Sequence, residues 1–284
     1  MKSTKNKLTF LYAECVDTSI KNESLCESVI FLGCRGRIVE VKYFLFSDIH
    51  GNLEALRVVL RQMEKFKPDR VICLGDVVGY GPNPNECVEL VDQYADLVIM
   101  GNHDHAVLEL TDITYFNKYA KFAVMWTRQV MKQENLEILG QYPFQHSLDD
   151  ILFVHSTPLN PERWDYIFNP LEGRYYLQHL QEHVCFIGHS HQPVFFEQDE
   201  SGHIAYDRKP KLSLDVKPAC KYIVNVGSVG QPRDGNPETS FATYDTEKHR
   251  IEVKRLPYNF RKTQQKMAEA KLPVFLIERL AHGR

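Results

Sequence analysis

Short β-rich runs alternate with amphipathic stretches along the first half of the chain, and this order restricts the folds that it can adopt. The run YFLFS is followed by a stretch from residue 53 to about 66 whose leucines recur at helical spacing. A strand expected at 70–74, a helix after Asn83-Pro84 and a strand at 97–100 continue the order. We therefore expect an α/β fold with a mainly parallel sheet.

The second half of the chain is richer in expected strands, and the short gaps between the later ones are typical of antiparallel hairpins. These strands are expected at residues 151–155, 184–188, 194–197, 222–226, 241–245 and 251–256. Residues 105–140 have the pattern of helices, which could form a cap beside a site. After Pro257 the composition shifts to Lys, Gln, Glu and Ala, which predicts a helical tail broken at Pro273.

Polar clusters stand at five places where a strand is expected to end: SDIHGN at 47–52, GDVVGYG at 75–81, GNHDH at 101–105, VHSTP at 154–158 and GHSH at 188–191. The carboxyl ends of parallel strands meet in one crevice, so clusters that are distant in sequence can come together. Each cluster alone has a simpler explanation, since Asp, Asn and Gly are common in turns and helix caps. All five together favour a functional site.

The clusters supply carboxylate, amide and imidazole groups, which suit divalent Mn, Fe, Ni or Zn, and no cysteine lies among them. The candidate ligands are Asp48, His50, Asp76, Asn102, His155, His189 and His191. This set is larger than a single ion needs. Two ions about 3.5–4 Å apart, bridged by a shared carboxylate, would use it fully and would supply a metal-bound hydroxide for attack on phosphorus.

Two of these candidates stand one residue apart. If the segment between Gly188 and Pro193 is extended, the alternation of side chains points the rings of His189 and His191 the same way. His155 taken alone could instead be a core histidine at the end of a strand.

Together the clusters form the pattern D-x-H, G-D, G-N-H-D, H and G-H-x-H over roughly residues 41–257, which resembles that of the calcineurin-like metallophosphoesterases. With GYGPNPNEC and SVGQPRDGNP, the set looks most similar to the bacterial predicted phosphodiesterases of that superfamily. The resemblance implies a four-layer α/β/β/α sandwich, in which two β-sheets pack together with helices outside.

The resemblance also implies roles for individual residues. It assigns Asp48, His50 and His191 to a first metal, Asn102, His155 and His189 to a second, and Asp76 to both as a bridge. His103 corresponds to the catalytic histidine of the family, which protonates the leaving oxygen or stabilises its charge. Asp104 would orient the ring of His103. Manganese is the metal we expect first.

The substrate class depends on residues outside this set. Protein phosphatases of the family have an arginine four residues after the bridging aspartate, whereas this chain has Tyr80 there. Without that guanidinium, a dianionic monoester is less favoured than a monoanionic diester. Arg233, in NVGSVGQPRDGNP, could approach the site and supply the charge, or it could lie in solvent on a hairpin turn. Asn52 either supports the site or caps the following helix, and we favour the cap.

We therefore expect hydrolysis of a phosphodiester or a nucleotide, and some of the similar bacterial phosphodiesterases act on dinucleoside polyphosphates. The first alternative is a protein serine/threonine phosphatase or a phosphomonoesterase. The second is a metal-binding scaffold for protein interactions, the role that a retromer subunit gives to this fold without the catalytic histidine. Because His103 is present, catalysis is favoured over the scaffold.

The composition of the chain restricts which partners and which cellular compartment we expect. A net charge of -3 offers no basic field for nucleic acid, which favours a small phosphoester or nucleotide substrate. No apolar run approaches the ~18 residues of a membrane span, so no membrane partner is expected. The chain has 7 cysteines, an odd number without a C-x-x-C pair, which is typical of reduced thiols in a cytoplasmic protein.

The sequence divides into three parts: a doubtful N-terminal extension over 1–40, a metallophosphoesterase domain over 41–257 and a helical tail over 258–284. One hypothesis for the extension is that translation starts at Val41, with Arg35-Gly36-Arg37 as the translation of a purine-rich ribosome-binding site. The alternative is a disordered or loosely packed extension of the native protein.

Overall fold

The structure is a computed structural model, and it describes residues 40–208 and 212–284. Apart from residue 40, the expected N-terminal extension lies outside the described residues, together with Cys15, Cys26 and Cys34. The compact unit that contains the described residues spans Val39–Arg284. Nothing in it separates the expected domain from the expected tail, so that division stays a prediction.

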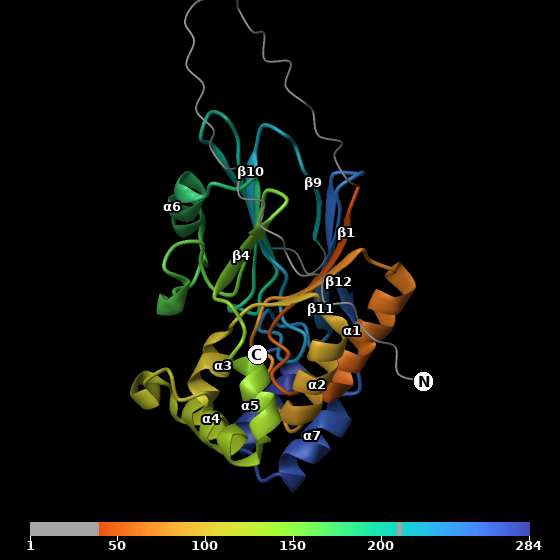
Figure 1. Ribbon diagram of the computed structural model, residues 1–284, viewed down its shortest axis with the longest axis vertical. Helices are drawn as coiled ribbons and strands as arrows, with labels where there is room; N and C mark the ends of the chain where they lie inside the picture. Colours follow the sequence, from red (N-terminus) through yellow and green to blue (C-terminus); the bar gives the residue numbers. More distant parts are fainter. Residues whose placement is uncertain (1–39, 209–211) are drawn as a thin grey trace, which may run out of the picture. The chain divides into compact units, whose positions relative to one another are not determined.

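Two six-stranded sheets form the centre of this unit (Figure 1). The first runs, in spatial order, through β3 (Leu97–Val98), β2 (Arg70–Cys73), β1 (Lys42–Phe46), β11 (Thr239–Asp245), β12 (Arg250–Leu256) and β9 (Leu212–Asp215). The second runs through β4 (Gln145–Leu148), β5 (Ile151–Val154), β6 (Val184–Ile187), β10 (Lys221–Asn225), β7 (Val194–Gln198) and β8 (Ile204–Asp207).

Both sheets are mixed. Strands β1, β2 and β3 pair in parallel, and so do β5, β6 and β10. The remaining pairs are antiparallel. The parallel strands expected from the first half of the chain form one side of the first sheet, and the second sheet has parallel strands at its centre. Antiparallel pairs, expected for the later strands, complete both sheets, so neither sheet is mainly parallel throughout.

Strand β1 shows how the layers form from alternating side chains. Tyr43 and Leu45 enter the core between the two sheets, where the Tyr43 ring lies 5.9 Å from that of Phe153 on β5. Phe44 and Phe46 point to the other face and pack beneath the helices. Both faces are apolar, so the strand is buried on both sides.

The helices complete a four-layer α/β/β/α sandwich, as predicted. Side chains of α1 (Leu53–Phe66) and α2 (Pro84–Tyr94) pack on the outer face of the first sheet, and α6 (Pro170–His179) packs on the outer face of the second. The remaining helices and helical turns are α3 (Asn102–Val107), η1 (Ile113–Tyr115), α4 (Lys118–Val130), α5 (Gln133–Leu139), η2 (Pro161–Arg163), α7 (Phe260–Glu269), α8 (Val274–Glu278) and η3 (Arg279–His282).

Some elements gave no signal in the sequence. Strand β4, QHSL, is polar and mostly exposed, so it lacks an apolar alternation. The short strands β8 and β9 were also missed. Helix α6 contains Gly173, which lowers helix propensity, but the Asn169 side chain caps its first turn.

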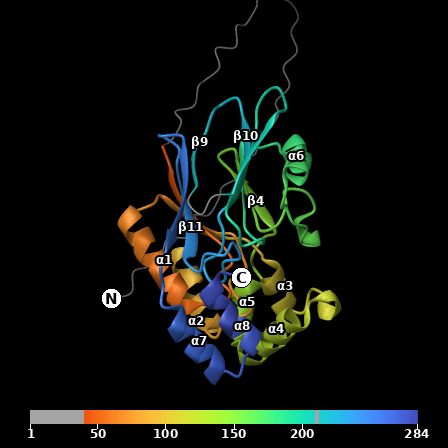
Figure 2. The ribbon, with the colours of Figure 1, turned by 180° about the vertical axis from the view of Figure 1, so that it is seen from behind.

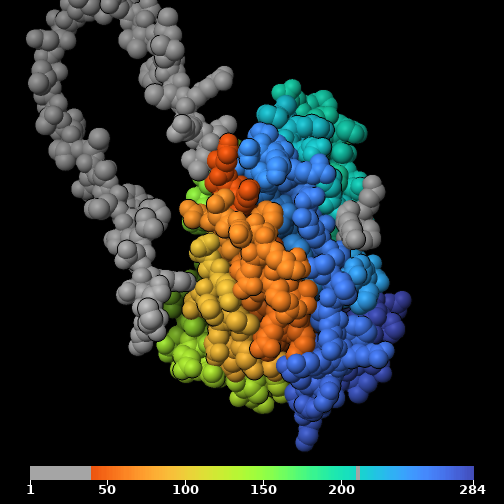
Figure 3. Space-filling model, turned by 90° about the vertical axis from the view of Figure 1, so that its right-hand side faces the viewer, coloured from red at the N-terminus to blue at the C-terminus, as the bar shows by residue number. Residues whose placement is uncertain are grey.

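The C-terminal helices pack against the rest of the unit. Helix α7 packs beside α1, and Figure 3 shows the orange α1 and the blue C-terminal helices side by side. Thr263 donates a hydrogen bond to Asn52 (3.0 Å), and the Lys266 ammonium lies 2.7 Å from the Glu54 carboxylate. Pro273 separates α7 from α8, as predicted for the tail. Within the two described ranges, no helix combines the length and the apolar character needed to cross a bilayer.

Candidate metal centre

The five polar clusters meet where the parallel strands of both sheets end. Asp48 and His50 follow β1, Asp76 follows β2, and Asn102 begins the helix after β3. From the second sheet, His155 follows β5, while His189 and His191 follow β6. Since all these ends point the same way within their sheets, one site receives side chains from both. The convergence expected from the sequence is confirmed.

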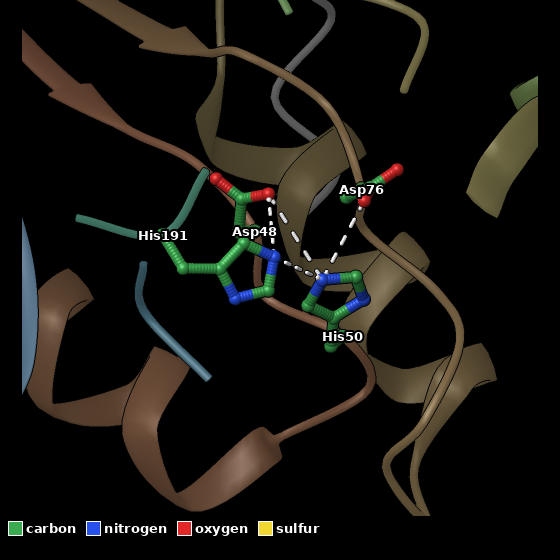
Figure 4. A group of neighbouring side chains, drawn as sticks. All are labelled: Asp48, His50, Asp76 and His191. Carbon is green, nitrogen blue, oxygen red and sulfur yellow. Dashed lines mark hydrogen bonds and ion pairs between the residues drawn. The ribbon is translucent and has the colours of Figure 1, made fainter. Parts of the chain in front are cut away.

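Asp48, His50, Asp76 and His191 form a first group, whose potential ligand atoms lie within 4.8 Å of one another (Figure 4). The Nε2 atom of His191 is 3.2 Å from Asp48 Oδ1 and 3.1 Å from His50 Nε2. His50 Nε2 is in turn 3.5 Å from Asp76 Oδ2. All four residues are buried.

Asp76 also belongs to a second group, with His155 and His189. Its Oδ2 atom lies 3.5 Å from His155 Nε2, the same distance that separates it from His50 Nε2 in the first group. Its other oxygen accepts a hydrogen bond from the main-chain NH of His103 (2.8 Å). One carboxylate oxygen is thus shared by two clusters of nitrogen ligands.

Main-chain carbonyl groups fix the four clustered histidines. The Nδ1 atoms of His50, His155 and His191 lie 3.0, 2.7 and 2.6 Å from the carbonyl oxygens of Val78, Leu74 and Gln231. His189 is turned the other way, with Nε2 2.9 Å from the carbonyl of Trp164. Each ring nitrogen beside a carbonyl carries a proton, so in the neutral form of each ring the lone pair of the opposite nitrogen is available to the cluster.

The backbone at the site is strained. The residues with positive φ include Asp48 (54°), His50 (50°), Asp76 (51°), His189 (64°) and His191 (60°). For residues other than glycine, such conformations cost about 1–3 kcal/mol each and concentrate at functional sites. The prediction of an extended segment around His189 is wrong: both histidines are left-handed, and they reach different groups of the cluster.

Burial governs the charge of the imidazoles. It lowers the pKa of His50 and His191 and brings that of His103 to about 4 and that of His189 to about 3. These rings are neutral at pH 7. His155 is the exception: burial opposes its charge, but the Asp76 and Asp48 carboxylates and the Leu74 carbonyl together raise the pKa of His155 to about 9.

The carboxylates remain ionised in spite of burial. Burial raises the pKa of both aspartates, but the surrounding histidines together outweigh it, so the pKa of each falls below its usual range. Among the described residues, the ion partners of both are histidines. The site therefore places two ionised carboxylates beside imidazole nitrogens in the protein interior.

Several polar atoms of the cluster have no hydrogen-bond partner although they are buried: Asp48 Oδ1, Asn102 Oδ1 and His155 Nε2. Leaving such atoms unpaired costs about 1–3 kcal/mol each, and more for a charged group. Divalent cations would satisfy all three. The donor set, its burial and these unpaired atoms therefore fit a metal centre.

Known proteins agree with this geometry. The model of the calcineurin-like phosphoesterase superfamily domain matches residues 41–249. An uncharacterised protein of Methanocaldococcus jannaschii is 39% identical over 246 residues, which cover 84% of this chain and 97% of that protein. This chain belongs to the calcineurin-like phosphoesterase superfamily. With the Asp/His cluster, membership indicates a phosphoesterase that has a dinuclear divalent-metal site.

Solved structures share the fold of this calcineurin-like phosphoesterase. A metallophosphoesterase from Sphaerobacter thermophilus has a TM-score of 0.77 and 38% identity, over 86% of this chain and 99% of that one. A hypothetical protein from Pyrococcus horikoshii has a TM-score of 0.70 at 20% identity, again over 86% and 99%.

His103 lies beside the cluster of the phosphoesterase, with its ring 4.9 Å from that of His50 and 4.4 Å from that of Tyr80. Its Nδ1 atom is buried without a partner. Asp104 was expected to orient this ring, but among the described residues its side chain is not hydrogen-bonded to it. Asp104 instead accepts the NH groups of Val78 (3.1 Å) and Gly101 (3.2 Å), because its side chain turns back over the start of α3.

The three candidate substrate residues differ in their surroundings. Asn52 caps α1 by accepting the Ala55 NH, as favoured from the sequence, and donates to the Gly230 carbonyl (2.8 Å). Tyr80 is buried against His103. Arg233 is half-buried, and its guanidinium carbon lies 5.7 Å from the centre of the Tyr80 ring, so it approaches the site rather than pointing away.

Gln231, which links several parts of the site, was not identified from the sequence. Its carbonyl oxygen accepts a hydrogen bond from His191 Nδ1 (2.6 Å), and its side-chain oxygen accepts one from Arg233 (2.9 Å). Tyr166 was missed as well. Its ring stacks on His189 at 4.0 Å and on Phe168 at 5.0 Å. Neither residue has a local pattern, since each reaches the site through a histidine distant in sequence, His191 for Gln231 and His189 for Tyr166.

Proposed function

We propose that this chain hydrolyses a phosphodiester or a nucleotide with a pair of divalent ions, for which manganese is the first candidate. The observation that carries the proposal is the shared Asp76 oxygen, 3.5 Å from a nitrogen ligand of each group. Asp48, His50 and His191 would hold one ion, Asn102, His155 and His189 the other, and Asp76 both. Such ions polarise phosphoryl oxygens and lower the pKa of a coordinated water.

The protein's own groups would complete the reaction. His103 lies next to the first group and would protonate the leaving oxygen or, as the neutral ring that burial favours, stabilise its charge through the ring N–H. Asp104 acts as a positioning residue, since it fixes Val78, and Gly79, the next residue, packs on the His103 ring. The bound ions would neutralise phosphoryl charge, and one imidazole would act on the leaving oxygen.

Two observations support a diester or nucleotide over a monoester. Tyr80 offers a neutral phenol where a phosphatase would place a bidentate guanidinium, and Arg233 adds one positive charge above it. Tyr166 and Phe168 stack in line with His189 and are 42% and 43% exposed. Exposed stacked rings beside the centre suit a substrate with an aromatic group, such as a nucleobase.

The proposed compartment is the cytoplasm, and the four described thiols support it. Cys73, Cys87, Cys185 and Cys220 are free and buried, which supports a reducing cytoplasmic location.

The test compares bis-p-nitrophenyl phosphate with p-nitrophenyl phosphate on manganese-loaded protein. We expect a higher kcat/KM for the diester. His103→Ala should lower kcat about 10²–10⁴-fold, the usual contribution of a general acid, and keep its metal content by elemental analysis. Asp76→Asn should lose both activity and metal. Faster cleavage of the monoester would show a phosphomonoesterase, and no turnover with metal fully bound would favour the scaffold.

A further inference from the structure

Two arginines from different segments gather at Tyr80. Arg233 comes from the loop after β10, and Arg279 from η3 in the C-terminal segment. Arg233 hydrogen-bonds to the Gln231 side chain, and its Nε atom is buried without a partner. Arg279 lies over the Phe275 ring at 5.5 Å and donates to the main-chain oxygen of Arg284. In the described ranges, neither guanidinium forms an ion pair with an acidic side chain.

The C-terminal segment is fixed to the loop that carries Arg233. Gly235 donates its NH to the carbonyl of Gly283 (2.9 Å). Gly283 has a φ of 60°, and a Cβ there would meet Asn236 at 2.5 Å, so the two segments are in direct contact. Figure 2 draws the C-terminus near the middle of the described fold, in agreement with these contacts. The position of Arg279 is therefore set by packing.

Apolar contacts hold the same segment over Tyr80. Leu280, next to Arg279, is 4% exposed and belongs to one cluster with Tyr80 and Leu276. Phe275 on α8 stacks on Tyr119 of α4 at 4.4 Å. Arg279 is thus carried by a turn that is anchored on both sides, which reduces the entropy lost when it binds a ligand.

Hydrogen bonds place Arg233 beside the metal centre. Its main-chain NH donates to the carbonyl of His191 (3.3 Å), and its side chain donates to Gln231, whose carbonyl lies 2.6 Å from His191 Nδ1. Arg279 directly precedes Leu280, which lines one cavity with His50, Tyr80 and Gln231. In agreement with this placement, burial and then the Arg233 charge lower the pKa of Arg279 to about 10. Two like charges so placed would be stabilised by an anion.

We propose that Arg233 and Arg279 form a two-arginine subsite that selects phosphoesters with a second phosphoryl group, such as nucleoside polyphosphates. Arg233 contacts the reacting phosphoryl group and Arg279 the next one along the substrate. The inference rests on the proposed function, and it assigns the C-terminal segment a part in recognition. A tyrosine at position 80 permits this arrangement, because its flat ring lies beneath the Arg233 guanidinium.

The test measures how strongly inorganic phosphate and pyrophosphate inhibit hydrolysis of bis-p-nitrophenyl phosphate, at a fixed excess of free manganese. Arg279→Ala should raise the inhibition constant of pyrophosphate about tenfold or more, the worth of one charge-assisted hydrogen-bonded contact, and that of phosphate much less. Arg279→Gln, which keeps the first three side-chain carbons and a polar end but removes the charge, should behave alike. Arg261→Ala removes an exposed arginine of α7 and should match the wild type for both anions.

Direct binding separates this inference from the proposed function. Titration calorimetry of pyrophosphate into the manganese-loaded protein gives the same comparison even if no ester is hydrolysed. If Arg279→Ala keeps the wild-type circular dichroism spectrum and binds pyrophosphate and phosphate with the same affinity ratio as the wild type, the proposed subsite is overturned. A loss of affinity for pyrophosphate alone, in a chain without turnover, would support the subsite and reject the enzyme.

Discussion

Individual residues at the centre are held by their backbones as much as by their side chains. Asp76 has a positive φ. One of its carboxylate oxygens accepts a hydrogen bond from the His103 NH, and the other lies 3.5 Å from a ring nitrogen of His50 and of His155. Gly101 lies against it so closely that a Cβ would clash with the main-chain nitrogen and Oδ1 of Asp76. The orientation of this carboxylate therefore depends on the absence of a side chain at position 101.

Gly101→Ala should consequently displace Asp76 and weaken metal binding at both groups. Gly101 has a φ of -95°, so the substitution adds no backbone strain and its effect would come from the clash alone. We expect a loss of about 1–3 kcal/mol in stability, as for other overpacked sites, and a manganese content below the wild-type value. Elemental analysis and thermal unfolding measure these quantities.

Gly140→Ala is the matched control, since its nearest neighbour would be at 3.5 Å, in ordinary contact. It should bind metal as the wild type does. Full metal occupancy in Gly101→Ala would show that Asp76 does not need this contact.

At the scale of elements, the start of α1 connects the site to the C-terminal segment. Asn52 caps α1, donates to Gly230 and to the Tyr258 hydroxyl (3.1 Å), and accepts from Thr263 on α7. Gly230 in turn donates its NH to the Asp48 carbonyl (2.9 Å). The buried Asn52 side chain thus connects α1, the loop at Gly230 and helix α7, and Gly230 in turn is hydrogen-bonded to Asp48.

Asn52→Ala should therefore cost more than the loss of a cap. A cap alone is worth about 1 kcal/mol, and each buried group left unpaired adds about 1–3 kcal/mol. We expect a total of about 2–4 kcal/mol in the free energy of unfolding, measured in urea.

Asn117→Ala provides the comparison, because Asn117 caps α4 through the Tyr119 and Ala120 NH groups and is exposed. It should cost about 1 kcal/mol. Equal destabilisation by the two variants would mean that the tertiary hydrogen bonds of Asn52 contribute nothing.

For the molecule as a whole, the metal centre lies at the junction of both sheets. Asp48 and Asp76 come from the first sheet, and His155, His189 and His191 from the second. Ions held between them would link the two layers by bonds that the unfolded chain cannot make. Their binding free energy therefore adds to the stability of the fold.

Removal of metal should lower the melting temperature. At a free ion concentration about 100 times Kd, binding stabilises by about 2.7 kcal/mol for each site, and this is lost in a chelator. Calorimetry with and without the chelator measures the change, and Asp76→Asn should show a much smaller one. An unchanged melting temperature in the wild type, with metal removal verified, would contradict a centre shared by the sheets.

Local chemistry made much of this architecture predictable. Helix α1 was expected over residues 53–66 and spans Leu53–Phe66, because its apolar spacing, its Asn52 cap and Pro68 are all local signals. The side chains that converge were also identified from sequence, since each follows a β-rich run and strand ends of a parallel sheet share an edge. The polar strand β4 and helix α6 lacked such signals.

The sequence by itself determined the set of polar side chains that meet and the superfamily that they resemble, and that resemblance implied the layers of the fold. Only the tertiary structure decided that one Asp76 oxygen faces both groups, that Asp104 holds the Val78 NH, and that the segment of Arg279 packs on Tyr80, over which Arg233 lies. The physical reason is range: periodicity and capping act within a few residues, whereas these contacts join segments that only packing of the two sheets and the C-terminal helices brings together.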